Sequence, residues 1–271
     1  MELAQVLTIA SKEARDRIRN RWVLVVSLVF TVLALVIAYF GSAQQGAVGF
    51  RSIEVTIASL VSLVIYLMPL IALMLGFDTI VGERERGSLS LLLSMPVTRA
   101  EVLVGKYLGL AAALTTSTLA GFGLVAVVLA PELDASGLLH YLAFIGSSVL
   151  FGLAFLSLAV LISAVARDRS RASGVAIGIW LFFVLVFDLA VLGILVATGG
   201  GVGGDLVPYA LLLNPADVFR ILNIVSLDEV RTLYGLATVF PEALASPGRL
   251  AIVMGGWIVI PLILASWRFR R

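Results

Sequence analysis

The sequence predicts an all-α integral membrane protein that forms a single transmembrane domain over residues 1–271. Three observations lead to this prediction. Hydrophobic residues make up 61% of the chain, charged residues only 13%, and the mean hydropathy is +1.09. A soluble domain of this size does not need so much apolar surface, so the core belongs in lipid. Six long apolar runs and a one-sided distribution of lysine and arginine complete the argument.

The first element is an amphipathic helix predicted over Glu2–Asn20. One face carries five charged side chains, and the other face is apolar. Such a helix lies along a bilayer surface instead of crossing it. The apolar face comprises Leu3, Val6, Leu7, Ala10, Ala14 and Ile18.

Six apolar runs predict six transmembrane helices. Each must be helical because lipid offers the backbone no hydrogen bonds. The shortest run has 18 residues, which at about 1.5 Å per residue nearly crosses a hydrocarbon core of roughly 30 Å. The predicted spans are Trp22–Tyr39, Ile57–Gly76, Tyr107–Leu129, Leu142–Ala166, Gly174–Ala197 and Leu250–Trp267.

Basic residues predict the orientation. Fifteen lysines and arginines fall on the side of the two termini and the second and fourth connections, and four fall on the other side. Because positively charged loops stay inside, both termini are expected in the cytoplasm. The net charge of +2 and the pI of about 9.1 are too modest to indicate a nucleic-acid partner.

The segment Gly82–Lys106, here called the 82–106 segment, interrupts the apolar sequence between the second and third spans. Glu83, Arg84, Glu85 and Arg86 form a run of alternating charge. Charges are costly inside hydrocarbon, so this run is expected in water at a membrane face.

A short amphipathic helix is predicted after the charges. Its helical spacing comes from Leu89, Leu92 and Leu93. Gly87 permits a tight turn before this helix, and Pro96 ends it. Thr98 and Glu101 then have the spacing of a capping box that opens the next helix. Such an element, which also includes Gly82 and Arg99, suits contact with a soluble partner; the alternative is an ordinary solvated loop.

The connection between the fifth and sixth spans contains two predicted short helices on the outer side. Asn214 and Pro215 have the pattern of a helix start, and Ser226 with Glu229 predicts a second helix through about Ala237. An apolar stripe on the first helix either rests on the bilayer or docks a periplasmic partner. The stripe consists of Val218, Phe219, Leu222 and Val225.

Asp188 lies near the middle of the fifth span, where an acid is a candidate functional residue. Neighbouring spans offer no lysine or arginine partner, so the alternative is a protonated or hydrogen-bonded packing residue. His140 with Glu132 and Asp134 is too weak a set to predict a metal site. We expect no metal site in this chain, which has no cysteine and one histidine.

Catalytic motifs are absent from the sequence. No GxxxxGK[ST] phosphate loop occurs, because Gly105 and Lys106 are followed by Tyr107. We therefore expect no catalytic residue and no bound cofactor here, with any ATP hydrolysis on another chain. The pairs Gly105/Gly109 and Gly174/Gly178 have GxxxG spacing, which permits close helix contact and is compatible with dimer formation.

The order Glu-Arg-Glu-Arg-Gly-Ser-Leu, then Leu92-Leu93, Pro96, Thr98-Arg99 and Gly105-Lys106 resembles the connection between spans two and three in ABC exporter permeases of the second class. The resemblance also covers the N-terminal helix, which would be an elbow helix, and the outer helices. It implies a bacterial inner-membrane permease that pairs with a second copy of itself. The 82–106 segment would be a coupling helix on a cytoplasmic ATPase dimer, which would bind ATP and magnesium.

Two further stretches, Lys12–Trp22 and Leu211–Asn223, are similar to one branch of this family. That branch implies a periplasmic β-helix partner and a role in assembling the copper site of nitrous oxide reductase, by mechanical transmission or by export of a sulfur- or copper-related species. Two alternatives stay open. One is a general exporter permease for lipid, glycan or drug, and the other is an ion-coupled carrier that uses Asp188.

Overall fold

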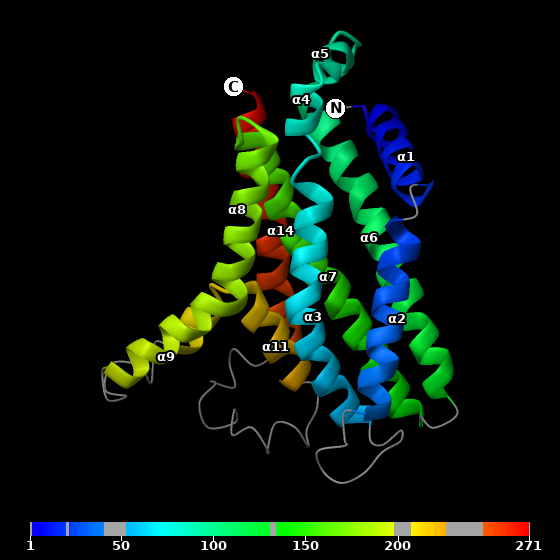
Figure 1. Ribbon diagram of the computed structural model, residues 1–271, viewed down its shortest axis with the longest axis vertical. Coiled ribbons are helices and arrows are strands. Elements are labelled where there is room, and N and C mark those ends of the chain that lie inside the picture. Colours follow the sequence, from blue (N-terminus) through cyan, green and yellow to red (C-terminus); the bar gives the residue numbers. More distant parts are fainter. Residues whose placement is uncertain are drawn as a thin grey trace.

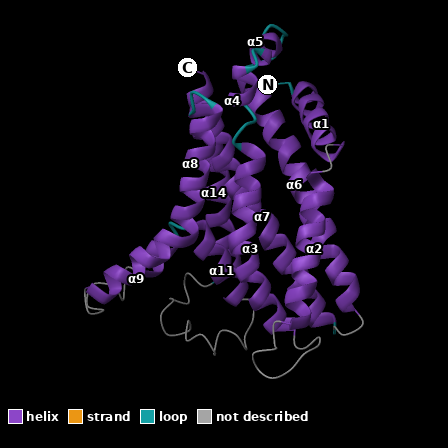
Figure 2. Cartoon of the chain, in the orientation of Figure 1, coloured by secondary structure: helices purple, strands orange, loops and turns teal. Residues whose placement is uncertain are grey.

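The computed structural model describes residues 2–19, 22–40, 53–130, 134–197, 207–225 and 246–270. The regular elements in these ranges are all helices, which confirms the predicted all-α class for the described residues (Figure 2). In chain order they are α1 (Leu3–Arg19), α2 (Trp22–Phe40), α3 (Ile53–Gly76), α4 (Val81–Glu85), α5 (Ser88–Leu93), α6 (Arg99–Leu129), α7 (Ala135–Val165), α8 (Arg169–Leu181), the π-helical turn η3 (Phe182–Val186), α9 (Phe187–Ala197), α10 (Val207–Leu211), α11 (Pro215–Val225) and α14 (Pro247–Arg270).

Five stretches of the described residues are long and apolar enough to cross a membrane. They correspond to the second to sixth predicted spans and cover Thr56–Glu85, Arg99–Leu129, Ala135–Val165, Arg169–Ala197 and Pro247–Phe269. The first predicted span is helical over Trp22–Phe40, but the apolar stretch described there, Val25–Ile37, is shorter. The number of six spans therefore stays a prediction.

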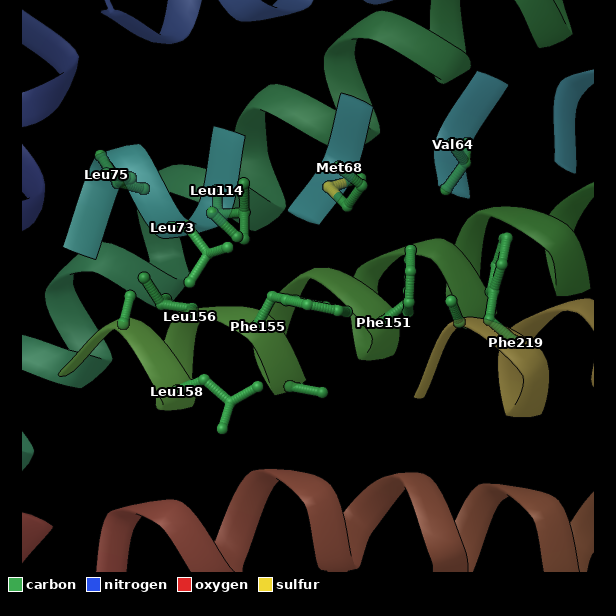
Figure 3. Close-up of a cluster of buried hydrophobic side chains, with 14 of the residues drawn as sticks. Val64, Met68, Leu73, Leu75, Leu114, Phe151, Phe155, Leu156, Leu158 and Phe219 are labelled. Carbon is green, nitrogen blue, oxygen red and sulfur yellow. The ribbon is translucent and has the colours of Figure 1, made fainter. Parts of the chain in front are cut away.

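Helix α7 forms the centre of the bundle, and α3, α6, α11 and α14 pack against it (Figure 1). Phenylalanine side chains fill the contact between α7 and α11. Phe151 meets Phe155 edge to face at 5.2 Å between ring centroids and stacks on Phe219 at 4.7 Å. Figure 3 shows that Met68 and Leu73 of α3 belong to the same cluster. This contact places α11 inside the core.

The position of α11 corrects the prediction of an exposed outer stripe. Asn214 does cap the helix, because its Oδ1 accepts the main-chain N–H of Ala216 at 2.9 Å. The stripe of Val218, Phe219 and Leu222 is buried, and so are Asn214 and Pro215. These side chains pack inside the bundle because α7 offers them an aromatic surface, so in this arrangement they neither rest on the bilayer nor dock a partner. The side chain of Val225 and the predicted second helix lie outside the described residues.

Helix α1 packs along α6 at two glycines (Figure 1). A Cβ atom on Gly105 would lie 2.8 Å from the Cβ of Ile9, and one on Gly109 would lie 2.6 Å from the carbonyl oxygen of Ala10. This GxxxG pair therefore serves a contact within the chain. The other pair, Gly174/Gly178, has no atom within 4 Å of either added Cβ among the described residues, so its role between copies stays a prediction.

The predicted fifth span is not one regular helix. It consists of α8, the π-helical turn η3 and α9, and the N–H of Phe187 bonds to the carbonyl of Phe182 five residues earlier. Beyond this turn α9 diverges from the bundle (Figure 1). No described side chain of α9 is buried.

The glycine contact generates a test with a control on the same helix. We expect Gly109→Ala to lower the free energy of unfolding by about 1–3 kcal/mol, because the backbone of α1 must move away from the added methyl group. Gly123→Ala should be neutral or stabilising, since no atom lies within 4 Å of its added Cβ and alanine favours the helix by up to about 1 kcal/mol. Thermal unfolding in detergent measures both, and equal stability of the two variants contradicts the prediction.

Candidate functional site

The local structure of the 82–106 segment follows the predicted pattern. Gly87 has a φ of 74°, in the left-handed region that glycine tolerates, and it separates the short helices α4 and α5. The capping box is present: the Oγ1 of Thr98 accepts the N–H of Glu101 at 3.2 Å, and the Oε2 of Glu101 accepts the N–H of Thr98 at 2.7 Å. These features fix the direction in which the chain enters and leaves α5.

Two of the four charged side chains bind the ends of other helices. Arg84 donates to the carbonyl oxygens of Ala166 at 2.9 Å and Ala164 at 3.4 Å, at the C-terminal end of α7. The Oε1 of Glu85 accepts the main-chain N–H of Arg169 at 2.8 Å, at the first residue of α8. A cation at a helix C-terminus and an anion at an N-terminus both complement the helix dipole. Together they attach α4 to the turn between α7 and α8.

Glu83 makes a partly buried ion pair, which corrects the prediction that the whole charged run lies in water. The Nζ of Lys106 contacts the Oε1 of Glu83 at 2.7 Å and the Oε2 of Glu13 at 3.1 Å. The lysine side chain is only 4% exposed. Two carboxylates and one ammonium group therefore join α1, α4 and α6. Glu85 and Arg86 are exposed as predicted, and so is Arg84 despite its contacts.

Arg99 ties the start of α6 to the end of α14. Its Nη1 donates to the carbonyl oxygen of Phe269 at 2.9 Å, and its guanidinium lies 5.8 Å from the centroid of the Phe269 ring. The region around α4 and α5 is therefore held to α1, α6, α7, α8 and α14. Among these helices, α4 contacts α6, α7 and α8 directly, and it is linked to α1 and α14 through Lys106 and Arg99 of α6.

The predicted apolar face of α5 is the side that faces the protein, and further apolar side chains lie on its exposed side. Leu89 is buried and belongs to the core, while Leu92 and Leu93 are half-buried. In α5 and the turn after it, the most exposed apolar side chains are Leu91 at 71% and Met95 at 59%. Sequence reasoning missed these two, although their spacing of four residues was the available signal. With Pro96, which is also exposed, they form what is here called the apolar tip of α5. Helix α5 projects beyond the bundle at the end where both termini lie (Figure 1).

Asp188 has an arginine partner that the sequence analysis did not identify, and it comes from α11 and not from a neighbouring span. The Nη2 of Arg220 contacts the Oδ2 of Asp188 at 3.0 Å, and its Nη1 binds the carboxylate of Asp217. The side chain of Asn214 donates to Asp217 at 2.8 Å and to the carbonyl oxygen of Phe183, within η3, at 3.0 Å. The network therefore joins α11 to the irregular part of the fifth span.

A metal site finds no support in the described residues, which contain no group of three or more His, Cys, Asp or Glu side chains placed to hold an ion. Asp134 instead caps α7, where its Oδ1 accepts the N–H of Gly137 at 2.7 Å. Glu132 lies outside the described ranges.

Comparison with known proteins identifies the family. A model of the family described as "ABC-2 family transporter protein" matches residues 7–271. The chain belongs to the ABC-2 transporter family. It is 46% identical over 270 residues to the "Probable ABC transporter permease protein NosY" of Pseudomonas aeruginosa, and 42% identical over 271 residues to the protein of that name in Stutzerimonas stutzeri. Each match covers 98% of both chains.

Membership of the ABC-2 family confirms the predicted class of protein. The chain is a permease subunit of an ABC transporter and not itself an enzyme, and such a permease works with an ATPase partner. The interpretation as a free-standing ion-coupled carrier is therefore set aside. Asp188 is bound to Arg220, which also binds Asp217, so its carboxylate has a structural partner.

The buried ion pairs predict a large effect of one substitution. We expect Lys106→Met to lower the free energy of unfolding by about 3–5 kcal/mol, because two carboxylates lose their buried cation. Lys12→Met is the matched control, because the pair between Lys12 and Asp16 is 67% and 54% exposed and such surface pairs contribute about 0–1 kcal/mol. Thermal unfolding of the purified variants measures the difference. If Lys106→Met is as stable as the control, the three charges do not hold these helices together.

Proposed function

We propose that this permease transmits the nucleotide cycle of a separate cytoplasmic ATPase through the 82–106 segment. The observation that carries the proposal is the set of contacts from Glu83, Arg84, Glu85 and Arg99 to four other elements, α6, the end of α7, α8 and α14. A push on a firmly attached surface element moves the helices bound to it. The exposed tip of α5 is the part left for the ATPase to contact. Gly82, Gly87, Leu89, Leu92, Leu93 and Pro96 give this element its shape.

The proposed assembly contains two copies of the permease and two ATPase subunits in the bacterial inner membrane. Both termini and the 82–106 segment lie at one end of the bundle (Figure 1). The same end carries most of the basic residues, which supports a cytoplasmic placement. The exposed apolar side chains of α9 are available to lipid or to the second copy. ATP and magnesium bind to the ATPase in this proposal.

More narrowly, we propose a role in maturing the copper site of nitrous oxide reductase. Two relatives named NosY support it, together with the resemblance of Lys12–Trp22 and Leu211–Asn223 to that branch. The implied partners are a NosF-like ATPase and a NosD-like periplasmic β-helix protein. With no cysteine and one histidine, the chain offers few soft ligands along a copper path. Mechanical transmission to the outer partner therefore fits the residues better than conduction of copper.

The periplasmic partner must dock on a surface other than the apolar stripe of α11. Asn214, Val218, Phe219 and Leu222 are buried, so they serve transmission by moving with α7 and α14. The docking surface itself would come from other outer residues.

One experiment separates transmission from transport. The permease, its ATPase and the outer partner are purified together and reconstituted in vesicles. The proposal expects ATP hydrolysis without copper flux. Copper flux that depends on ATP would refute it. Hydrolysis stimulated by a lipid, glycan or drug, without an outer partner, would favour the second candidate, a general exporter permease.

The apolar tip of α5 gives a sharper test of the ATPase contact. We expect Leu91→Glu and Met95→Glu to reduce co-purification of the ATPase at least about tenfold, because each buries a charge in an apolar contact. Both sites are exposed, so the permease itself should unfold at an unchanged temperature. Ser11→Glu is the control, since it adds the same charge on the exposed face of α1. An undiminished ATPase yield with both tip variants excludes this contact.

A further inference from the structure

A basic cavity lies between the 82–106 segment and the ends of α7 and α14, and its interior has not been assigned a role above. Its volume is about 420 Å³, and it is bounded by α5, the C-terminal end of α7 and the C-terminal end of α14. Four arginines line it, and no aspartate or glutamate does so among the described residues. They are Arg84, Arg99, Arg167 and Arg268.

Two of these arginines are held in place and two are available. Arg84 and Arg99 donate to main-chain carbonyls, which are neutral, so their positive charges are not balanced by these contacts. Arg167 and Arg268 are exposed, and no ion pair of either occurs within the part of the chain that the structure describes. Four like charges around one cavity repel each other, and an anion bound between them relieves that repulsion.

An apolar cavity adjoins the basic one. It has a volume of about 450 Å³ and shares Val165, Ala166 and Arg167 with the basic cavity. Its remaining wall is apolar apart from Arg171 at the rim, which pairs with Asp168 at 3.1 Å. The ligand of a basic cavity that continues into an apolar one has a charged end and a hydrocarbon end.

The apolar surface continues further along α7. A third cavity of about 450 Å³ shares Leu161 with the second and runs between α7 and α14. Figure 3 shows Leu158, which lines this third cavity, on the side of α7 that faces α14. Both apolar cavities adjoin helices that are long and apolar enough to cross a membrane, so we expect them to open toward lipid.

We propose that these cavities bind one anionic phospholipid. Its phosphate binds at Arg167 and Arg268, with Arg84 and Arg99 adding positive charge. One acyl chain lies past Val165 and Val175 toward Leu161. Guanidinium groups suit phosphate because they donate two parallel hydrogen bonds. An acyl chain gains little by leaving the bilayer for an apolar cavity, because both surroundings are hydrocarbon. The affinity therefore comes from the head group, and the apolar cavity only selects for a ligand that carries an acyl chain.

The position of the site gives the lipid a structural role. Leu89, Ser90 and Leu93 of α5 form part of the wall of the basic cavity. A bound head group therefore fills the space between α5 and the ends of α7 and α14, and it braces the 82–106 segment. The proposal concerns the single chain and does not depend on any ATPase.

The test measures lipid retention by the full-length chain. Native mass spectrometry in detergent compares phosphatidylglycerol with phosphatidylcholine. We expect the wild type to retain phosphatidylglycerol preferentially. The double variant Arg167→Gln/Arg268→Gln should bind it about 25-fold more weakly, since each arginine near an anionic lipid contributes about fivefold. The control Arg15→Gln/Arg19→Gln removes two exposed arginines from α1 and should retain wild-type binding.

A second variant tests the hydrocarbon part of the site. Val175→Trp places a bulky side chain at the apolar cavity and should reduce phosphatidylglycerol retention while leaving all arginines in place. Thermal unfolding checks that each variant is folded. Three outcomes overturn the proposal: equal retention of the two lipids by the wild type, equal losses in the two arginine pairs, and competition by glycerol phosphate as strong as by phosphatidylglycerol. The last outcome would indicate a site for a soluble phosphate compound and not for a lipid.

Discussion

Helix ends that meet at a membrane boundary leave main-chain groups without partners, and this constraint explains much of the polar sequence of the chain. Lipid cannot supply the missing hydrogen bonds. The protein uses side chains from other helices instead. Arg84 donates to carbonyl oxygens at the end of α7, and Glu85 accepts the first N–H of α8. The Oγ of Ser163 accepts the N–H groups of Ile80 and Val81 at 2.9 and 3.1 Å. Arg84 and Glu85, which the sequence pattern places in a solvated loop, therefore cap the ends of other helices.

Polar contacts between helices are distributed unequally between the two ends of the molecule. At the end with the two termini, the ion pairs of Lys106 and the contacts of Arg99 join neighbouring helices. At the other end, α9 leaves the bundle beyond η3 and buries no described side chain (Figure 1). The proposed transmission would use both properties, because a soft input would absorb the motion and a rigid output would not respond to it.

The sequence predicted the local features well and the long-range partners poorly. The turn at Gly87, the capping box of Thr98 and the start of α11 at Asn214 depend on a few adjacent residues, so their patterns are visible in the chain. The partner of Asp188 is Arg220, which lies 32 residues away on α11, a helix that is not a predicted span. An amphipathic helix has the same spacing whether its apolar face meets lipid, another protein or the core, which is why burial of the α11 stripe could not be predicted.

The π-helical turn in the fifth span determines the directions in which the side chains of α9 point around the helix axis. Its extra residue shifts the helix register by about 100°, the angle between successive residues of an α-helix. With this offset, Asp188 contacts Arg220 and the side chain of Asn214 donates to the carbonyl oxygen of Phe183. Loss of one residue between Phe182 and Val186 would leave the composition and hydropathy of the span almost untouched. It would nevertheless turn the acid to another side of the helix, so the length of this stretch carries information that its residue types do not.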